Sequence, residues 1–300
     1  MADGGCRILD GKSLAAALHA EIRARVEQEM HRRGRPPGLA VILVGDNPAS
    51  QAYVAGKERT AKQKCGFRTF NAAMPAHSSA EEIRRVIEGY NRSAEVDGIL
   101  LQLPLPKHLD SAPLLNLILP QKDADGLHPF NQGLLMRGMD GLRPCTPSGV
   151  LKLIDLAYAL EGAGPAPERD LSGKRALVIG RSILVGKPVA LMLLQRNATV
   201  TLAHSRSPDL AGLCRQADII VAAVGAAGLV RGDWVSPGAV VIDVGMNRTA
   251  EGTLTGDVVF DELRERCAAL TPVPGGVGPM TVAMLMYNTL QAYLAGAAAS

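Results

Sequence analysis

The sequence predicts an α/β protein with two α/β domains, the second a Rossmann-like doubly wound parallel sheet. Apolar runs alternate with amphipathic runs along the chain, as strands and helices do in parallel sheets. The 300 residues, 47% of them hydrophobic, are enough for roughly two domains. A stretch at 161–169 with the composition of an exposed loop separates two such α/β series.

The first series predicts alternating helices and strands. An apolar stripe with helical spacing over 14–30 predicts the first helix. Either Asp46 or Asn47 can cap the next helix, in which Pro48 suits the first turn and which we expect to reach about Gly66. Strands are expected at 38–44, 67–74 and 96–104.

A third helix is predicted by its start signal. Ser78 and Ser79 each stand three residues before a glutamate, Glu81 and Glu82. In a capping box, serine and glutamate side chains bind the free backbone N–H groups of the first turn. We therefore expect a doubled capping box here.

The second series has the element order of a nucleotide-binding sheet. A strand, a glycine turn and a helix come first, and three more strands follow. These elements are expected at 174–180, 186–195, 198–204, 217–225 and 239–245.

Composition excludes several classes of partner. A net charge of +3 and an aromatic content of 3% offer neither a basic face nor stacking platforms for nucleic acid. No apolar run reaches membrane-spanning length, and the first residues lack the features of a secretion signal. Five scattered cysteines without a CxxC pair support neither a disulfide framework nor a zinc site. We expect a cytoplasmic protein that needs no metal.

The glycine turn of the second series is a candidate phosphate site. Gly180 ends the strand, and Gly186 opens the helix ahead of Pro188. Backbone N–H groups and the helix dipole favour an anion at such a place. Because Ser182 replaces the second glycine of GxGxxG, an ordinary strand-to-helix turn remains the alternative.

The end of the next strand indicates which dinucleotide is preferred. NAD-selective folds carry an acid there, about 20 residues beyond the first glycines, to bind the ribose hydroxyls. Here the strand ends in His204, Ser205 and Arg206. Arg181, Ser205 and Arg206 could bind a 2′-phosphate instead, although solvated surface arginines would give the same pattern. The sequence favours NADP.

A helix face in the first series carries a candidate acid/base group. Ser50, Tyr53 and Lys57 share one helical face. A lone Tyr/Lys pair is commonly a solvated ridge, but this helix follows a strand and a glycine turn. Its face can therefore lie at the carboxyl edge of a sheet, where ligands bind. A lysine base requires a pKa lowered from about 10.4 by burial or charge.

Two further polar side chains lie where strands and turns end. Gln102 closes a buried strand, so its amide is costly to leave unpaired. Asp125 precedes a glycine and could pair with the N–H groups of a heterocycle. A glutamine at a sheet edge and an ordinary turn aspartate are the structural alternatives.

A loop near the end of the chain is rigid and uncharged. Residues 271–281 hold three glycines and three prolines beside an apolar helix start. Such a loop presents backbone rather than side chains to a ligand.

Five motifs, taken in order, resemble the bifunctional methylenetetrahydrofolate dehydrogenase/methenyltetrahydrofolate cyclohydrolase family. The resemblance spans nearly the whole chain. The motifs are Ser50-x-x-Tyr53-x-x-x-Lys57, the run 98–106 around Gln102, Lys122-Asp123-Ala124-Asp125-Gly126, Gly180-Arg181-Ser182-x-x-Val185-Gly186-x-Pro188, and Pro274-Gly275-Gly276-Val277-Gly278-Pro279-Met280-Thr281.

The resemblance implies a folate site in a cleft between two domains. It implies a catalytic domain at 1–147 completed by the C-terminal helix at 280–300, and an NADP domain at 148–279. Lys57 would be the central acid/base group, supported by Ser50, with Gln102 tuning it. Tyr53 would stack on the pterin or position it, and Asp125 would anchor that ring.

The same resemblance implies the remaining binding residues and a homodimer. Those near NADP are Gly180, Arg181, Ser182, Val185, Gly186, Pro188, Ser205 and Arg206. Those near folate, besides Tyr53, Gln102 and Asp125, are Leu103, Pro104, Pro274, Gly275, Gly276, Val277 and Thr281.

The activity implied is NADP-dependent oxidation of 5,10-methylenetetrahydrofolate to the methenyl form, followed by hydrolysis to 10-formyltetrahydrofolate. A dehydrogenase without cyclohydrolase activity is one alternative. A non-catalytic folate- or nucleotide-binding module is another, but it would be expected to lack Lys57, Gln102 or Asp125. Short-chain dehydrogenases also use Tyr-x-x-x-Lys, but their glycine turn precedes that pair, whereas here it follows.

Overall fold

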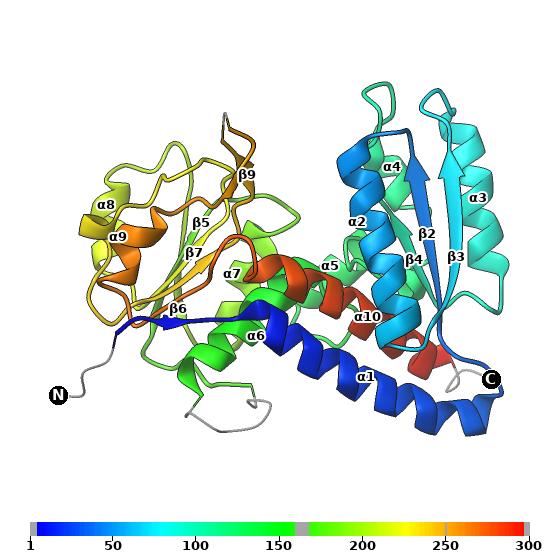
Figure 1. Cartoon of the computed structure of the whole chain (residues 1–300), viewed down its shortest axis with the longest axis horizontal. Coiled ribbons are helices and arrows are strands. Elements are labelled where there is room, and N and C mark those ends of the chain that lie inside the picture. Colours follow the sequence, from blue (N-terminus) through cyan, green and yellow to red (C-terminus); the bar gives the residue numbers. More distant parts are fainter. Residues whose placement is uncertain (1–4, 160–167, 250, 297–300) are drawn as a thin grey trace. The chain divides into compact units, whose positions relative to one another are not determined.

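The computed structural model describes residues 5–159, 168–249 and 251–296 (Figure 1). The chain forms two compact units. Unit 1 contains the chain up to Ala16 together with Thr146–Thr281, and unit 2 contains Ala17–Cys145 and the chain from Val282 on. Most of the loop expected at 161–169, and the last four residues of the expected C-terminal segment, lie outside the described residues.

Unit 2 is built on a parallel sheet of three described strands. β2 (Gly38–Val44) lies between β3 (Arg68–Met74) and β4 (Gly98–Leu101). All three point the same way, with Ala40 paired to Phe70 on one side and to Ile99 on the other. The strands expected at 38–44 and 67–74 are confirmed. β4 is shorter than expected because the backbone turns at Gln102, before the cis Leu103–Pro104 bond.

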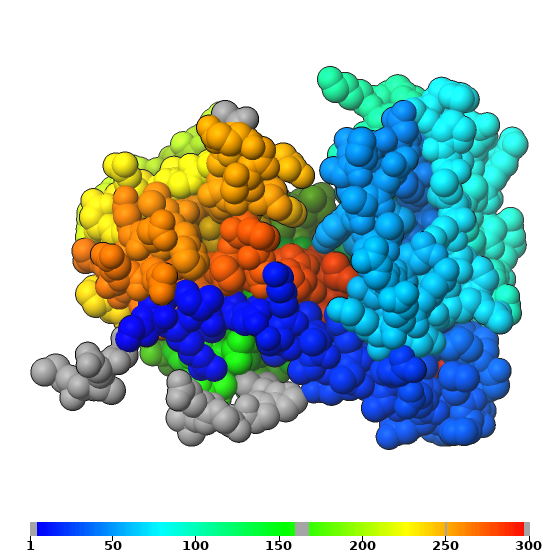
Figure 2. Space-filling model, in the orientation of Figure 1, coloured from blue at the N-terminus to red at the C-terminus, as the bar shows by residue number. Residues whose placement is uncertain are grey.

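Helices cover this sheet and connect its strands. They are α1 (Gly11–Arg33, whose first residues belong to unit 1), α2 (Pro48–Arg59), the π-helix η1 (Thr60–Lys64), α3 (Ala80–Arg92), α4 (Ser111–Leu115), the 3-10 helix η2 (Pro120–Lys122), α5 (Pro129–Met136) and α10 (Val277–Gly296). Much of α1 is exposed at the surface, as the space-filling view shows in blue (Figure 2). Its other face buries Ile22 and Val26.

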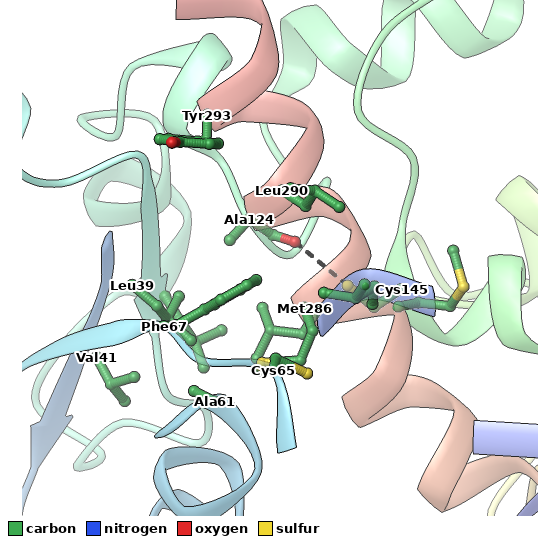
Figure 3. Packing of buried hydrophobic residues seen from close by; sticks show 14 of the residues in the cluster. Leu39, Val41, Ala61, Cys65, Phe67, Ala124, Cys145, Met286, Leu290 and Tyr293 are labelled. Carbon is green, nitrogen blue, oxygen red and sulfur yellow. Dashed lines mark hydrogen bonds between the residues drawn. The ribbon is translucent and has the colours of Figure 1, made fainter. Parts of the chain in front are cut away.

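The C-terminal helix contributes to the core of unit 2. Met286, Leu290 and Tyr293 of α10 pack in one buried cluster with Leu39 of β2 and Phe67, which precedes β3 (Figure 3). Burying apolar surface contributes about 25 cal/mol per Å². A segment from the far end of the chain is therefore part of the hydrophobic core around the first sheet.

The starts of α2 and α3 are fixed by side-chain caps. Asn47, one of the two candidates, accepts N–H bonds from Ala49 and Ser50. At α3 the doubled capping box is wrong, because only Ser79 and Glu82 exchange hydrogen bonds. Ser78 is buried, and its carbonyl oxygen lies 3.0 Å from His108 Nε2, so its position before the helix leaves no second box.

Unit 1 is built on a parallel sheet in which six strands are described. Their order is β1-β11-β8-β7-β5-β6, with helices joining them, which confirms the doubly wound prediction. The strands are β1 (Arg7–Ile8), β5 (Arg175–Ile179), β6 (Thr199–Ala203), β7 (Ile219–Ala222), β8 (Val240–Asp243) and β11 (Ala269–Leu270). The other elements are α6 (Cys145–Tyr158, which begins at the last residue of unit 2), α7 (Gly186–Gln195), α8 (Leu210–Arg215), η3 (Gly232–Trp234), α9 (Phe260–Arg264) and the antiparallel pair β9 (Asn247–Arg248) and β10 (Leu254–Thr255).

The N-terminal strand belongs to this second sheet. β1 pairs with β11 through Arg7 opposite Ala269 and Ile8 opposite Leu270. The domain at 1–147 inferred from the sequence differs from the observed division at this point. Two parallel strands from opposite ends of the chain meet here, a pairing that no local pattern announces.

In the described part of the chain, no helix combines the length and the apolar character that crossing a membrane requires.

Replacing Ser79 by Ala should lower the free energy of unfolding by about 1 kcal/mol, because the first turn of α3 loses its cap. Glu81→Ala is the matched control, since Glu81 forms only surface ion pairs with Arg84 and Arg85, and should change stability by less than about 0.5 kcal/mol. Urea unfolding measures both. Equal losses in the two variants would contradict the observed register of the capping box.

Candidate functional site

Helix α2 brings a buried lysine against an aromatic ring and an amide. The Lys57 side chain is 6% exposed, and its Nζ donates to Gln102 Oε1 at 3.0 Å. The same nitrogen lies 4.4 Å from the centre of the Tyr53 ring, within cation–π range. The helix face of Tyr53 and Lys57 and the strand-end Gln102, which the sequence analysis treated as separate features, therefore meet at the Lys57 amine.

Burial and charge act on Lys57 in opposite directions. Burial lowers the pKa of the ammonium, while the Asp125 carboxylate opposes that shift. Burial also raises the pKa of Tyr53 to about 12, so its phenol keeps its proton at neutral pH. The site therefore holds a lysine whose neutral amine is more accessible than that of a surface lysine, beside a phenol that is not ionised.

The Gln102 amide is held in one orientation. Its backbone N–H donates to the carbonyl of Ile42 at 2.9 Å, which places it at the carboxyl edge of the sheet. Its side-chain N–H group donates to the carbonyl of Leu103. Because the amide nitrogen is used in this way, the amide oxygen faces Lys57 and accepts from it. Leu103 is half-buried and Pro104 is exposed just beyond.

Asp125 lies in a turn whose shape depends on glycine. Gly126 has φ +71°, and a Cβ at this position would come within 2.3 Å of the Arg143 carbonyl carbon. Burial raises the pKa of Asp125, and Lys57 opposes that shift. Neighbouring Asp123 has a different role, because it accepts from the His128 N–H and from Asn131 Nδ2, both at 2.8 Å, and so holds the turn.

The sequence analysis missed two residues that support this turn. Asn288 of α10 donates through Nδ2 to the carbonyls of Ala124 at 2.9 Å and Arg143 at 2.7 Å. The Cys145 thiol donates to the carbonyl of Ala124 at 3.3 Å (Figure 3). The available signal for Asn288 was an asparagine in the mostly apolar helix α10. Nothing in the sequence around Cys145 indicated this contact.

Ser50 is buried at the start of the same helix face. Its backbone N–H is bound to the Asn47 side chain. Among the described residues, its hydroxyl forms no hydrogen bond with Lys57. The structure thus brings Lys57, Tyr53, Gln102 and Asp125 together, and it places Ser50 on the helix that carries the first two.

In unit 1, the candidate phosphate turn is fixed by close backbone contacts. Gly180 has φ +119°, and a Cβ there would come within 2.2 Å of the Ala223 carbonyl oxygen. A Cβ on Gly186 would lie 1.9 Å from the Gly180 carbonyl oxygen. Ser182 Oγ accepts the Val185 N–H at 3.1 Å and so closes the turn into α7, where Pro188 is buried. Only glycine fits at the two glycine positions.

Three exposed side chains lie at the carboxyl ends of the adjacent strands β5 and β6. Arg181 follows β5, and Ser205 and Arg206 follow β6. His204 orders that second turn, since its Nδ1 accepts the Arg206 N–H at 3.2 Å. No carboxylate follows β6 in residues 204–207. A negatively charged group would therefore meet arginines rather than an acid at this edge.

Two buried aspartates organise the loops beside this turn, and the sequence analysis missed both. Asp257 accepts backbone N–H bonds from Val224, Gly225 and Ala226 in the loop after β7. Asp243, at the end of β8, accepts the N–H groups of Asp257 and Gly245, and burial raises its pKa to about 6. Apart from Gly245, which is two residues from Asp243, these partners lie 14 to 33 residues away along the chain, so no local motif marks them.

The glycine and proline loop is tightly folded within unit 1. Gly275 has φ +116°, and the Gly276 N–H donates to the Pro272 carbonyl at 2.8 Å. Gly275, Gly276 and Val277 are buried, whereas Pro274 is exposed. Thr281, in the same unit, shares a hydrogen bond of 3.0 Å with Thr146.

Across residues 5–159, 168–249 and 251–296, no three His, Cys, Asp or Glu side chains gather in a way that could hold a metal ion.

Two family models match the chain. The model of the tetrahydrofolate dehydrogenase/cyclohydrolase catalytic domain matches residues 9–125, and that of the NAD(P)-binding domain matches residues 144–296. The bifunctional FolD methylenetetrahydrofolate dehydrogenase/cyclohydrolase of Campylobacter jejuni is 42% identical, with a TM-score of 0.90 over 97% of this chain and 99% of that one.

Two other solved structures are also similar. FolD of Trypanosoma brucei, complexed with NADP cofactor and inhibitor, is 40% identical, with a TM-score of 0.89 over 98% of this chain and 99% of that one. The NAD-dependent 5,10-methylenetetrahydrofolate dehydrogenase of Saccharomyces cerevisiae is 22% identical, with a TM-score of 0.80 over 98% and 99%. At that identity the yeast structure supports the fold alone.

Replacing Asp125 by Asn should lower the pKa of Lys57 further, because the negative charge that opposes the effect of burial is removed. Titration of the lysine side chains by NMR, with Lys57→Met used to assign the signal, measures this shift. Glu81→Gln, which removes an exposed acid on α3, is the control and should leave the pKa unchanged. A Lys57 pKa that stays the same or rises in Asp125→Asn would contradict the proposed coupling.

Proposed function

Because the chain belongs to the tetrahydrofolate dehydrogenase/cyclohydrolase family, we propose that it is a bifunctional enzyme of one-carbon metabolism. It oxidises 5,10-methylenetetrahydrofolate to 5,10-methenyltetrahydrofolate with NADP+ and hydrolyses that product to 10-formyltetrahydrofolate. The observation that carries this proposal is the contact of the buried Lys57 amine with Gln102 and Tyr53, beside Asp125.

Lys57 manages the protons of the hydrolysis. Water must lose a proton as it adds to the methenyl carbon, and a ring nitrogen must gain one as the carbon–nitrogen bond breaks. A lysine whose pKa is lowered by burial can accept and return a proton near neutral pH. Gln102 holds the Lys57 Nζ at the carboxyl edge of the sheet, so the amine reaches the reacting atoms from a fixed position.

The residues beside Lys57 orient the folate. Tyr53, which keeps its phenolic proton, offers a ring face to the pterin. Asp125 pairs with the N–H groups of that ring, and Leu103 and Pro104 line the edge next to Gln102. Pro274, Gly275, Gly276, Val277 and Thr281 are assigned to the same substrate through the family motif.

The residues of unit 1 fit a dinucleotide. When bound, NADP+ accepts a hydride from the methylene carbon of the folate. Gly180 and Gly186 carry no Cβ that would clash with nearby backbone carbonyls, so the turn after β5 folds tightly and can present backbone N–H groups to a phosphate. Val185 and Pro188 start the helix whose positive dipole end favours that anion.

NADP is the cofactor we propose, for a reason specific to this chain. Arg181, Ser205 and Arg206 follow β5 and β6, and no acid stands where a ribose-binding carboxylate would be needed. Guanidinium groups bind a 2′-phosphate through charge-assisted hydrogen bonds.

The proposal extends to domains and assembly. The folate domain would comprise 1–147 with 280–300, and the NADP domain 148–279, although the compact unit around the second sheet also takes in the first residues of the chain. A homodimer in the cytoplasm is proposed through the family. Leu202 is exposed on β6, the edge strand of the described sheet. It supports an association surface, since an edge strand with apolar side chains favours pairing.

A dehydrogenase without cyclohydrolase activity is disfavoured by the buried contact between Lys57 and Gln102.

Lys57→Met should reduce cyclohydrolase turnover by at least about 100-fold, because the group that moves protons is lost. Binding of NADP, followed by fluorescence titration, should survive, since the residues assigned to it lie in unit 1. Lys62→Met, which changes an exposed lysine of η1, is the matched control and should keep wild-type rates. Hydrolysis by Lys57→Met at the wild-type rate would refute the role given to this lysine.

The wild-type enzyme should turn over faster with NADP+ than with NAD+. Arg206→Ala should lower kcat/KM for NADP+ by about 10- to 100-fold, because it removes a hydrogen bond to a charged phosphate. The same substitution should change kcat/KM for NAD+ by less than about threefold. Arg215→Ala, on α8, is the control. A wild-type preference for NAD+, or equal losses with both cofactors in Arg206→Ala, would overturn the assignment.

A further inference from the structure

Two cysteines from opposite ends of the chain meet at the edge of the unit 1 sheet. Cys6 directly precedes β1, and Cys267 lies two residues before β11. Their sulfur atoms are 3.3 Å apart. These two thiols have no place in the proposed folate and dinucleotide chemistry.

Backbone hydrogen bonds hold together the two strands that begin just after the pair. The Arg7 N–H donates to the Ala268 carbonyl, and the Leu9 N–H donates to the Leu270 carbonyl, both at 2.8 Å. Both bonds lie just after the two cysteines in the chain and fix the spacing of the strands that begin there. A disulfide needs a sulfur–sulfur distance of about 2.05 Å. The remaining approach of roughly 1.3 Å is within reach of side-chain rotation next to an edge strand of two residues.

We propose that Cys6 and Cys267 are a modification site that forms a reversible disulfide by exchange with a small-molecule disulfide such as oxidised glutathione. The Cys6 thiolate attacks one sulfur of the small disulfide, and the first glutathione leaves as a thiolate that takes up a proton. The Cys267 thiolate then attacks the Cys6 sulfur and releases the second glutathione. Two protein thiols are oxidised, and one disulfide is reduced to two thiols.

Exposure and charge assign the first step to Cys6. Its side chain is half-buried, whereas Cys267 is 4% exposed. Burial raises the pKa of both thiols, but Arg264 favours the Cys6 thiolate. Because both thiols are mostly protonated, thiol–disulfide exchange is slow. The disulfide therefore forms under a sustained oxidising redox potential rather than during a brief exposure to oxidant. Cys65, Cys145 and Cys214 are buried and serve as internal references.

The link would fix the N-terminal segment on the glycine and proline loop. From β1 the chain reaches Gly11, where a Cβ would lie 1.8 Å from the Gly276 carbonyl oxygen. The Lys12 side chain covers Gly275, with Cε 3.6 Å from a Cβ placed there. In the reduced protein, this segment is held by non-covalent contacts, among them the pairing of β1 with β11 and the bond from Arg7 Nη1 to the Ala159 carbonyl. In the oxidised protein, the same segment is tethered covalently beside β11, which leads directly into the loop.

The test uses the full chain, first reduced completely and then incubated with oxidised glutathione over a range of redox ratios. Peptide mapping without reduction should find one intramolecular link, between the peptides that contain Cys6 and Cys267. Its formation should raise the midpoint of thermal unfolding by about 5 °C, since a long loop of the unfolded chain is closed. Cys214→Ser should behave like the wild type in both measurements.

Single variants separate the steps. Cys267→Ala should leave Cys6 as a stable mixed disulfide with glutathione, and Cys6→Ser should abolish both the adduct and the thermal shift. A wild-type protein that keeps both thiols free at every redox ratio, or that carries glutathione on Cys6 without closing the link, would overturn the proposal. Links among other cysteines in place of this one would overturn it as well.

Discussion

The buried amine of Lys57 is the constraint on which the rest of unit 2 depends. Taking an ammonium out of water is costly unless partners replace its hydration. Three groups do so: the Gln102 amide oxygen at 3.0 Å, the Tyr53 ring face and the charge of Asp125. Two of these groups depend on other residues for their position. The Gln102 amide is oriented by its hydrogen bond to the Leu103 carbonyl. Asp125 lies in a turn that requires glycine at position 126. The remaining cost of burying the charge lowers the pKa of Lys57.

The turn that carries Asp125 is itself held from the far end of the chain. Asn288 bonds to the carbonyls of Ala124 and Arg143, on either side of the Gly126 contact. Its helix is fixed in turn by the apolar cluster that Met286 and Leu290 join. The hydrophobic packing of α10 therefore supports the turn that holds the Asp125 carboxylate near Lys57. A change that loosens the helix acts on the acid/base group without touching it.

How much the sequence could predict depended on how far apart the interacting residues lie. The Asn47 cap, the Tyr53 and Lys57 helix face and the Gly180 turn are local, and spacing alone indicated them. The doubled box was wrong because α3 begins at Ala80, so that Ser79 is the N-cap and Ser78 lies one residue outside it. Asn288 and Asp257 bind partners across long stretches of chain, and Asp243 binds Asp257, which lies 14 residues further on. No periodicity reveals such contacts.

The candidate site of unit 2 is formed by side chains, whereas that of unit 1 is formed by backbone. This difference determines which substitutions each unit tolerates. In unit 2 side chains form the site, so Gln102 and Asp125 can be varied to tune Lys57 while the sheet persists. In unit 1 backbone forms the turn, since Gly180 and Gly186 allow no Cβ and Asp257 binds three consecutive N–H groups. A side chain added there would move the backbone that faces the ligand. The residues that we propose to select the cofactor, Arg181, Ser205 and Arg206, are exposed. Substitutions there should alter cofactor selectivity without disturbing the turn that we propose binds phosphate.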